Sequence, residues 1–286
     1  PMDKPWLYQY PVGVPAEIDI TQFSSLKDVL ATSCARFADL PAYNSRGTVM
    51  TYRQLDEASC AFAAWLQKVG GLQRSDRVAL MMPNLLQYPV VLFGVLRAGM
   101  VVVNVNPLYT PRELKHQLSD YGATAIVVLE NFAHTLEQVI ASTPLRTVIT
   151  TQVGDLLPPL KRLLTNAVVK HVNKMVPPWW LSGGVDFRRV LADGRARVLD
   201  EMVPVLIDLA RQAKAFDLNF TIDAEEADRL ELSLDVISAT LRDASLAGWN
   251  GFGLAIQAYQ KRAEAVIDYV DQLAAHHDRR LMVRLV

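Results

Sequence analysis

The sequence has little cysteine and no excess charge of either sign. Of its 286 residues only Cys34 and Cys60 are cysteine, which is too few for a disulfide framework. Both lie in apolar helical patterns, so we expect two core thiols in a reducing, cytoplasmic compartment. Lys and Arg number 29 against 30 Asp and Glu, which leaves no concentrated basic face for a nucleic acid. No basic, apolar and small-residue leader opens the sequence, so no signal peptide is expected.

Long apolar runs are scarce as well. The one candidate for a membrane span covers residues 78–96, which carry no charge, but Pro83 and Pro89 interrupt it. This stretch is more typical of a buried strand, a loop and a helix than of a spanning helix. With 51% hydrophobic and 21% charged residues, the chain has the composition of a globular protein.

Two predicted helices carry their own start signals. Thr51 and Gln54 have the spacing of a capping box, and the apolar face that follows ends at Gly70. Thr110 and Glu113 repeat the pattern, with Pro at the first helical position and a stop at residue 122. Short apolar runs alternate with these helices, at 78–82, 100–105, 125–129 and 147–150. The spacing predicts βαβ units, and therefore an α/β fold with a parallel sheet layer.

Between about residues 152 and 196 the alternation weakens and Pro pairs and a Gly pair interrupt the chain. The clearest element is a basic amphipathic helix predicted over 160–176. Two interpretations stay open for the stretch 160–180: a surface excursion, or a peripheral contact with the inner membrane. Trp179 and Trp180 could anchor such a contact or pack on the domain. The basic residues of the predicted contact are Lys161, Arg162, Lys170 and Lys174.

Several stretches of the first two thirds resemble one known family. The run GLQRSDRVALMMPNLLQYPVVLFGVLRAGMVVVNVNPLYTPRELKHQL, residues 71–118, is similar to the bacterial long-chain fatty-acyl-CoA ligases of the adenylate-forming superfamily. The runs KPWLYQYPVGVPAEID, SSLKDVLATSCARFADLPAY and NFAHTLEQVI are similar to the same proteins. The resemblance covers roughly residues 2–193.

The resemblance implies ATP, Mg²⁺ and coenzyme A as the family's ligands, because these enzymes join a fatty acid to AMP and then to coenzyme A. The family holds the phosphates with a Ser/Thr/Gly-rich loop that carries a Lys. Ser182-Gly183-Gly184 is the only Gly pair here with a hydroxyl neighbour, and no Lys follows it. We therefore expect no tight binding of these ligands by this chain.

The last third has its own alternating pattern. A helix is predicted over 197–214 with Val198, Val203, Leu206, Leu209 and Ala210 facing inward. Strand-like runs follow at 218–222, 252–256 and 281–286, with helices predicted around 230–241 and 265–274. The longer spacing is typical of a (β/α)8 barrel, which needs about 250 residues, so the pattern predicts an incomplete barrel fragment.

The runs FTIDAEEADRLELSLDVI, LAGWNGFGLAIQAYQKR and RRLMVRLV resemble the proline dehydrogenase barrel of the bifunctional proline utilization A proteins. The resemblance implies FAD as cofactor, with Asp223 as the catalytic residue near flavin and substrate. It also implies that Gln257 and Arg284 bond the edge of the flavin ring and that Val286 offers backbone contacts. The family's flavin-side Lys and its Arg pair for the proline carboxylate have no counterpart in the matching segment, so we expect no tight FAD binding.

Each of these residues also has a structural interpretation. Asp223 could cap the following helix, Gln257 could close a turn, and Arg284 could pair with an acidic neighbour. His276 and His277 are expected to end a helix in solvent, since no further ligands are spaced around them for a metal.

The stretch RRVLADGRARVLDEMV, residues 188–203, is predicted to be a polar loop that turns into a helix and to join the two segments near Gly194. We therefore predict two domains, a ligase-like fragment at 1–194 and a dehydrogenase-like partial barrel at 195–286. Residues 1–196 hold 19 Lys and Arg against 15 Asp and Glu, whereas residues 197–286 hold 10 against 15. A natural fusion, a misjoined reading frame and a deliberate chimera all fit this pattern.

Three functional classes follow from the two resemblances. The first is a fragment of a long-chain fatty-acyl-CoA ligase that is inactive as it stands. The second is an FAD-dependent proline dehydrogenase fragment. The third is a non-catalytic α/β scaffold that self-associates through open sheet edges, since a few barrel strands cannot close on themselves.

Overall fold

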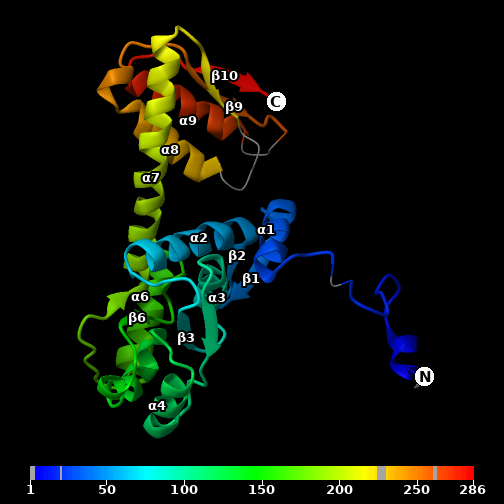
Figure 1. The fold of residues 1–286 in the computed structure, drawn as a ribbon, viewed down its shortest axis with the longest axis vertical. Coiled ribbons are helices and arrows are strands. Elements are labelled where there is room, and N and C mark those ends of the chain that lie inside the picture. The colour runs from blue at the N-terminus through cyan, green and yellow to red at the C-terminus, as the bar shows by residue number, and fades with distance from the viewer. Residues whose placement is uncertain (1–3, 20, 224–229, 260–262) are drawn as a thin grey trace.

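The structure is a computed structural model that describes residues 4–19, 21–223, 230–259 and 263–286. An N-terminal arm leads into a first sheet with its helices, and one long helix runs from there to a second sheet (Figure 1). The arm carries a short 3-10 helix, η1 (Pro5–Gln9), and leads to α1 (Leu26–Phe37). A hairpin follows, in which β1 (Pro41–Ser45) pairs antiparallel with β2 (Thr48–Thr51).

The first sheet is parallel, as the alternating pattern predicts. Its strand order is β4-β3-β5-β6-β7. The strands are β3 (Arg77–Met81), β4 (Val101–Asn104), β5 (Ala125–Leu129), β6 (Thr147–Thr151) and the short β7 (Val185–Asp186). β5 is buried along its whole length, which is what a central strand covered on both faces requires.

The helices of this layer start where their caps predict. In α2 (Tyr52–Lys68) and α4 (Pro111–Asp120) both halves of the capping box are formed, by Thr51 with Gln54 and by Thr110 with Glu113. The residues between β3 and β4 form α3 (Gln87–Arg97), so the uncharged run is a strand, a loop and a helix. The chain between β5 and β6 contains α5 (Ala133–Glu137) with single turns η2 (Glu130–Phe132) and η3 (Ile140–Ser142) at its ends.

Alternate residues of each strand enter different cores, because successive side chains of a strand point to opposite faces. Val78 and Leu80 of β3 pack with α2 and α3, whereas Ala79 and Met81 pack with α4 and α5. The two faces of the sheet are therefore both covered. The described residues contain no helix with the length and apolar character that a membrane span requires.

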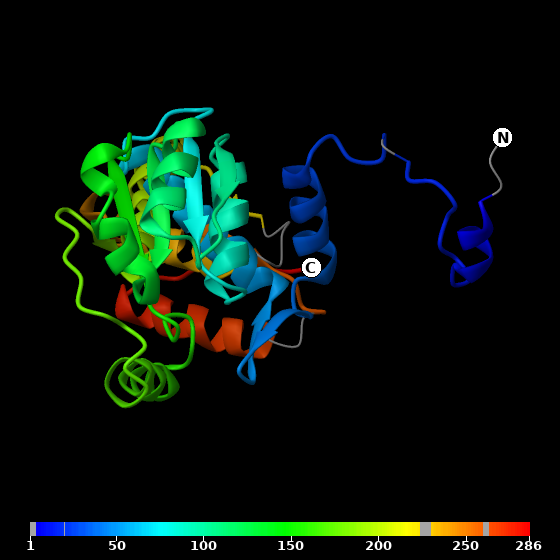
Figure 2. The same ribbon diagram turned by 90° about the horizontal axis from the view of Figure 1, so that it is seen from below.

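The excursion between β6 and β7 carries α6 (Pro159–Ala167) and one π-helical turn, η4 (Val168–Val172). The helical structure thus ends before residue 176, the end that the sequence predicts. Figure 2 shows this green helix nearly end-on at the lower left, beside the body of the first layer. The two tryptophans that follow differ: Trp179 packs against the second core cluster, whereas Trp180 is 78% exposed.

The long helix α7 (Phe187–Ala215) corrects the prediction of a polar loop around Gly194. The helix begins at Phe187, because the Asp186 carboxylate accepts hydrogen bonds from the backbone N–H groups of Arg188 and Arg189 and so caps its first turn. Gly194 is buried in the helix rather than in a loop. The predicted boundary between residues 194 and 195 falls inside this continuous helix.

The second sheet is parallel, with the order β10-β9-β8. Its strands are β8 (Phe220–Ile222), β9 (Phe252–Ile256) and β10 (Met282–Leu285), and its helices are α8 (Leu230–Leu241), the turn η6 (Ala244–Leu246) and α9 (Ala263–His276). These elements agree with the predicted partial barrel. Their core takes Ala210 from α7 and partly buries Leu206, but Leu209 is 46% exposed. Its predicted inward position is wrong, because none of the elements in the described ranges buries that side of α7.

Candidate functional site

The candidate site lies on the face of the second sheet opposite the one that packs against α7, α8 and α9. Phe252, Leu254 and Ile256 of β9 point into the core shared with α7, α8 and α9. Gly253 and Ala255 alternate with them and therefore lie on the opposite face. The register sets Arg284 of β10 level with Ala255. On the other side of β9 it pairs Ile222 with Leu254, so Asp223 follows at the level of Ala255.

The structure brings Asp223 and Arg284 together. The Nη2 nitrogen of Arg284 lies 3.2 Å from both carboxylate oxygens of Asp223. Because β9 lies between β8 and β10, this ion pair passes across β9 at Ala255, which is 1% exposed. Only a small side chain at this position leaves room for such a pair. Both partners are more than half exposed, so the pair adds about 1 kcal/mol or less to stability.

Gln257 and Val286 extend the sheet by one register position. The Val286 N–H donates to the Ile256 carbonyl at 3.0 Å, and the Val286 carbonyl accepts from the Ala258 N–H at 2.9 Å. This pattern places Gln257 beside Val286 and, by alternation, on the face of Ala255 and Arg284. The predicted residues therefore gather at the carboxyl edge of one face, where (β/α)8 barrels hold their ligands. The backbone N–H and carbonyl of Val286 are therefore already hydrogen-bonded within the sheet.

Two alternatives from the sequence have different outcomes. Arg284 does pair with an acidic neighbour, Asp223. The alternative role of Asp223 as a helix cap concerns residues 224–229, which lie outside the described residues.

The histidine pair His276 and His277 lies at the end of α9. The rings of His276 and His277 stack edge to face with centroids 4.9 Å apart. Desolvation is the main cause that lowers the pKa of His277, followed by the charges of His276, Arg279 and Arg242. Across the described ranges no three metal-binding side chains come together.

The carboxyl edge of the first sheet holds a buried polar network that the sequence did not single out. The Gln87 amide donates to the Gln152 carbonyl at 2.6 Å and the Thr151 hydroxyl donates to Asp155 at 2.8 Å. Desolvation raises the pKa of Asp155 above its ordinary value, although the Gln152 N–H and the Thr151 hydroxyl oppose this shift. The available signal was Glu130 directly after β5 and Gln152 directly after β6, and the Gln152 amide donates to the Glu130 carboxylate at 2.9 Å. These groups satisfy one another, so the network closes the edge instead of opening a site.

The Gly pair near β7 does not form a phosphate loop. Gly183 adopts a φ of +73° in the turn before β7. The helix that follows, α7, has its first N–H groups bonded to the Asp186 carboxylate. A phosphate at a helix N-terminus needs those N–H groups and is repelled by a carboxylate.

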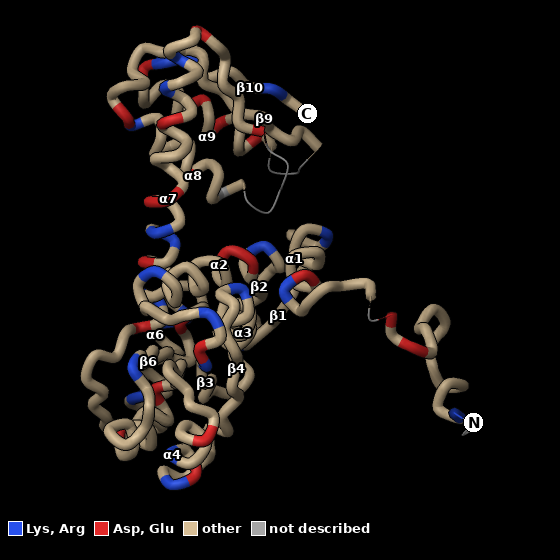
Figure 3. The backbone as a smooth tube through the Cα atoms, in the orientation of Figure 1, with Lys and Arg blue, Asp and Glu red and all other residues tan. Residues whose placement is uncertain are grey.

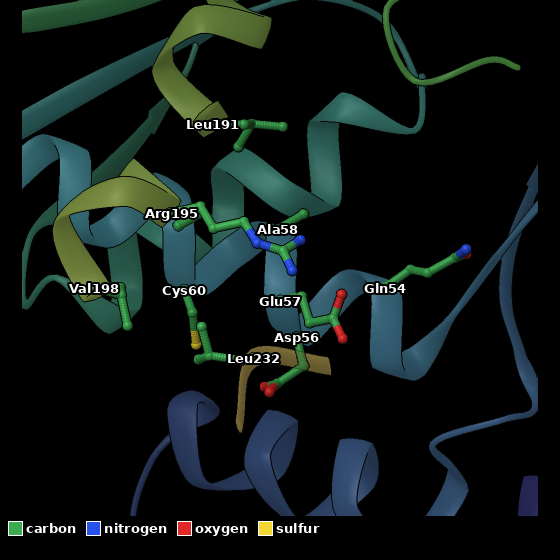
Figure 4. Close-up of a pocket in the computed structure, with 10 residues that line it drawn as sticks. Gln54, Asp56, Glu57, Ala58, Cys60, Leu191, Arg195, Val198 and Leu232 are labelled. Carbon is green, nitrogen blue, oxygen red and sulfur yellow. The ribbon is translucent and has the colours of Figure 1, made fainter. Parts of the chain in front are cut away.

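A cavity of about 280 Å³ lies where α2, α7 and α8 meet (Figure 4). Its charged groups have partners nearby: Asp56 pairs with Arg97, and Arg195 pairs with Asp235 of α8. Arg97 also donates to the Cys60 thiol, 3.1 Å away. Neither cysteine of the described residues forms a disulfide, and Cys34 is buried as expected. The cavity thus lies between the two parts of the chain, and two of its charged lining residues, Asp56 and Arg195, are paired.

Residues 30–196 match the family model of the AMP-binding enzymes. The match covers more than half of the chain, and the chain belongs to this family. It is 59% identical over 194 residues to a long-chain-fatty-acid–CoA ligase from Yersinia pestis, an alignment that takes in 68% of this chain and 34% of that protein. The chain thus spans about a third of the length of the ligases it matches.

A second similarity covers another part of the chain. The chain is 53% identical over 90 residues to the bifunctional protein PutA of Salmonella typhimurium, which amounts to 32% of this chain and 7% of that protein. A crystal structure of bifunctional proline utilization A protein is 79% identical over 32% of this chain and 9% of that one, with a TM-score of 0.32. The chain is therefore a chimera of ligase-like and PutA-like segments.

Proposed function

We propose that the larger segment derives from an enzyme for ATP-dependent activation of long-chain fatty acids, and that the polypeptide of residues 1–286 does not catalyse this reaction by itself. The family match and the 59% identity to a ligase support the derivation. The capped N-terminus of α7 supports the second part of the proposal, the lack of catalysis. It is the helix start that follows the Gly pair, and a carboxylate already binds its first N–H groups.

The physical reason is the charge that develops on the phosphates during adenylation. Oriented N–H donors and a Lys normally stabilise that charge, and removal of one such donor lowers turnover about 100-fold or more. Asp186 supplies negative charge instead at the only glycine pair with a hydroxyl neighbour.

The test is pyrophosphate release from ATP, Mg²⁺ and palmitate, with an intact long-chain-fatty-acid–CoA ligase as positive control. We expect no release above a sample without protein. Palmitate-dependent release that rises with protein concentration would contradict the proposal.

A second candidate is the proline dehydrogenase of the PutA-like segment, and the gathering of Asp223, Gln257 and Arg284 on one face favours it. Donors at this edge fit one side of a flavin ring, which carries negative charge after hydride transfer. We propose that binding is nevertheless very weak. A ligand site encloses about 70% or more of its ligand, whereas a sheet of three strands offers one wall.

FAD fluorescence during titration tests this candidate, followed by proline with a dye acceptor. We expect little quenching and no dye reduction. Quenching that saturates at micromolar protein, together with dye reduction that Arg284→Ala abolishes and Arg280→Ala preserves, would establish the dehydrogenase. Arg280 is a matched control, since it is an exposed Arg just before the same strand.

The third candidate is a scaffold that associates with a second copy through β10. Val283 and Leu285 are 43% and 57% exposed on this edge strand, and exposed edges of this kind pair readily. Light scattering over a range of concentrations tests it, since Val283→Lys should shift the mass toward the monomer. The low number of cysteines, two in 286 residues, supports a reducing, cytoplasmic location for all three candidates.

A further inference from the structure

The helix α6 is attached to the protein by its polar side, whereas the following turn η4 buries one apolar residue, Val169. The Asn166 side chain accepts from the Gly154 N–H at 2.7 Å and donates to Gln152 at 2.8 Å. Lys161 donates to the backbone carbonyl of Arg46. Surface helices ordinarily pack their apolar stripe inward and turn polar residues to the solvent. Here the arrangement is reversed.

The apolar side of this segment is consequently exposed. Leu160, Leu163 and Leu164 are 71%, 67% and 57% exposed, and Val168, Val172 and Met175 are 43%, 70% and 57% exposed. Leu160, Leu163 and Leu164 lie on one side of α6 because of their spacing of three and four residues. Val168 and Val172 continue the exposed apolar run through the π-helical turn, and Met175 follows in the loop after it. These six residues form what we call the α6 stripe. A contiguous apolar surface of this kind marks an interaction site in a folded protein.

Charge identifies the partner. Between Asp155 and Asp186 the sequence contains no Asp or Glu, whereas it contains four Lys and Arg and His171. Lys170 and Lys174 are exposed beside the stripe. Figure 3 shows charges of both signs elsewhere on the chain, including α7. A purely basic margin around an apolar stripe complements a surface with negative headgroups over hydrocarbon.

Trp180 lies at the end of the same segment with 78% of its surface exposed. Tryptophan gathers at the membrane interface because its ring is apolar and its N–H is polar. We propose that the α6 stripe, Lys170, Lys174 and Trp180 together dock this protein on the surface of an anionic lipid bilayer. The helix lies in the plane of the interface, with the stripe among the acyl chains and the lysines at the headgroups.

The experiment is sedimentation of the full chain with vesicles of phosphatidylcholine containing roughly a third phosphatidylglycerol, a share that gives the surface a negative potential. Leu163→Asn/Leu164→Asn removes two leucines from the stripe, and we expect about a 100-fold weaker partition. Leu108→Asn is the matched control, because Leu108 is 81% exposed outside the stripe. These side chains already face solvent, so circular dichroism should report an unchanged fold for both variants.

Lys170→Gln/Lys174→Gln tests the charge. Each lysine near an anionic surface contributes about 1 kcal/mol, so we expect about a 30-fold loss on the anionic vesicles and none on pure phosphatidylcholine. Lys115→Gln, an exposed lysine of α4, should bind like the parent. The Trp emission should shift to the blue with vesicles, and Trp180→Phe should remove that shift while Trp6→Phe keeps it.

Three results would overturn the proposal. The first is absence of sedimentation with anionic vesicles at low salt. The second is equal binding by the parent and Leu163→Asn/Leu164→Asn. The third is a concentration-dependent oligomer in the absence of lipid that the leucine variant abolishes, because the stripe would then bind a second copy of the chain.

Discussion

Gly194→Ala tests how the long helix holds the two segments together. Gly194 of α7 packs directly on α2, and a Cβ placed there would lie 2.8 Å from the Ala61 carbonyl carbon and 3.2 Å from Trp65 Cβ. It would lie closer still to the Ala61 carbonyl oxygen. Because the contact is with backbone, no side-chain rotation relieves it. The helices must therefore separate by on the order of an ångström, which loosens a close-packed interface.

The magnitude follows from two opposing effects. Alanine favours the helix over glycine by about 1 kcal/mol, whereas forcing an extra methyl into a packed interface costs about 1–3 kcal/mol and more when backbone has to move. We expect a net loss of about 2 kcal/mol. For a folded unit of roughly 200 residues this corresponds to a fall of about 4–8 °C in the midpoint of thermal unfolding.

The assay is thermal and urea unfolding followed by circular dichroism, with hydrogen exchange of α7 as a local readout. Ala196→Gly is the control, since residue 196 is exposed in the same helix and reports helix propensity alone. If the close contact were absent, Gly194→Ala would stabilise the protein by the amount that Ala196→Gly destabilises it. A midpoint equal to or above that of the parent would refute this account of the α2 and α7 interface.

Three further predictions concern the two parallel sheets. Burial raises the pKa of Asp155, so the folded state holds the carboxyl proton more tightly than the unfolded state does. The stability that this adds is present at low pH. It is lost as the pH rises from the ordinary aspartate pKa through the raised pKa. Asp155→Asn keeps an acceptor for Thr151, so its urea midpoint should change less with pH over that window than the parent's; parallel curves would contradict the assignment. Ala255→Leu should push apart Asp223 and Arg284 and expose their sheet face, which amide exchange of β10 would detect, whereas unchanged protection would contradict the packing across β9. Gly253→Ala should destabilise the same sheet by about 1–3 kcal/mol, because its Cβ would lie 2.5 Å from the Met282 carbonyl oxygen; an unchanged unfolding midpoint would contradict this.

The sequence predicts most of the regular elements because local chemistry determines them. The capping boxes at Thr51 and Thr110 mark helix starts to the residue, and the apolar runs coincide with the parallel strands within one or two residues. Their alternation also predicts the α/β class, since each buried strand needs helices on both faces. None of these inferences requires knowledge of distant contacts.

Long-range contacts account for what the sequence could not predict. Leu209 follows the apolar spacing of its helix and yet faces solvent. The spacing predicts an apolar face, but whether a residue on it is buried depends on the element that packs there. The exposure of the α6 stripe could not be predicted for the same reason. The periodicity predicts an amphipathic helix but does not say which side of that helix packs on the protein. The Asp223 and Arg284 pair needs the strand order, which places β9 between their strands.

The join between the two segments also combines local structure with long-range contacts. A helix propagates through hydrogen bonds between residues four apart, so it continues across a join provided that each turn is acceptable locally. The first turns of α7 bury Phe187 and Val190 in the core of the first sheet, and Ala210 enters the core of the second. Between them Pro204 removes one backbone donor, a defect that an exposed position tolerates because water satisfies the carbonyl left behind. The Lys68 and Glu201 ion pair at 2.7 Å is half exposed and adds little stability. Each half of α7 is thus held by its own core, and this explains how segments with different relatives share one uninterrupted helix.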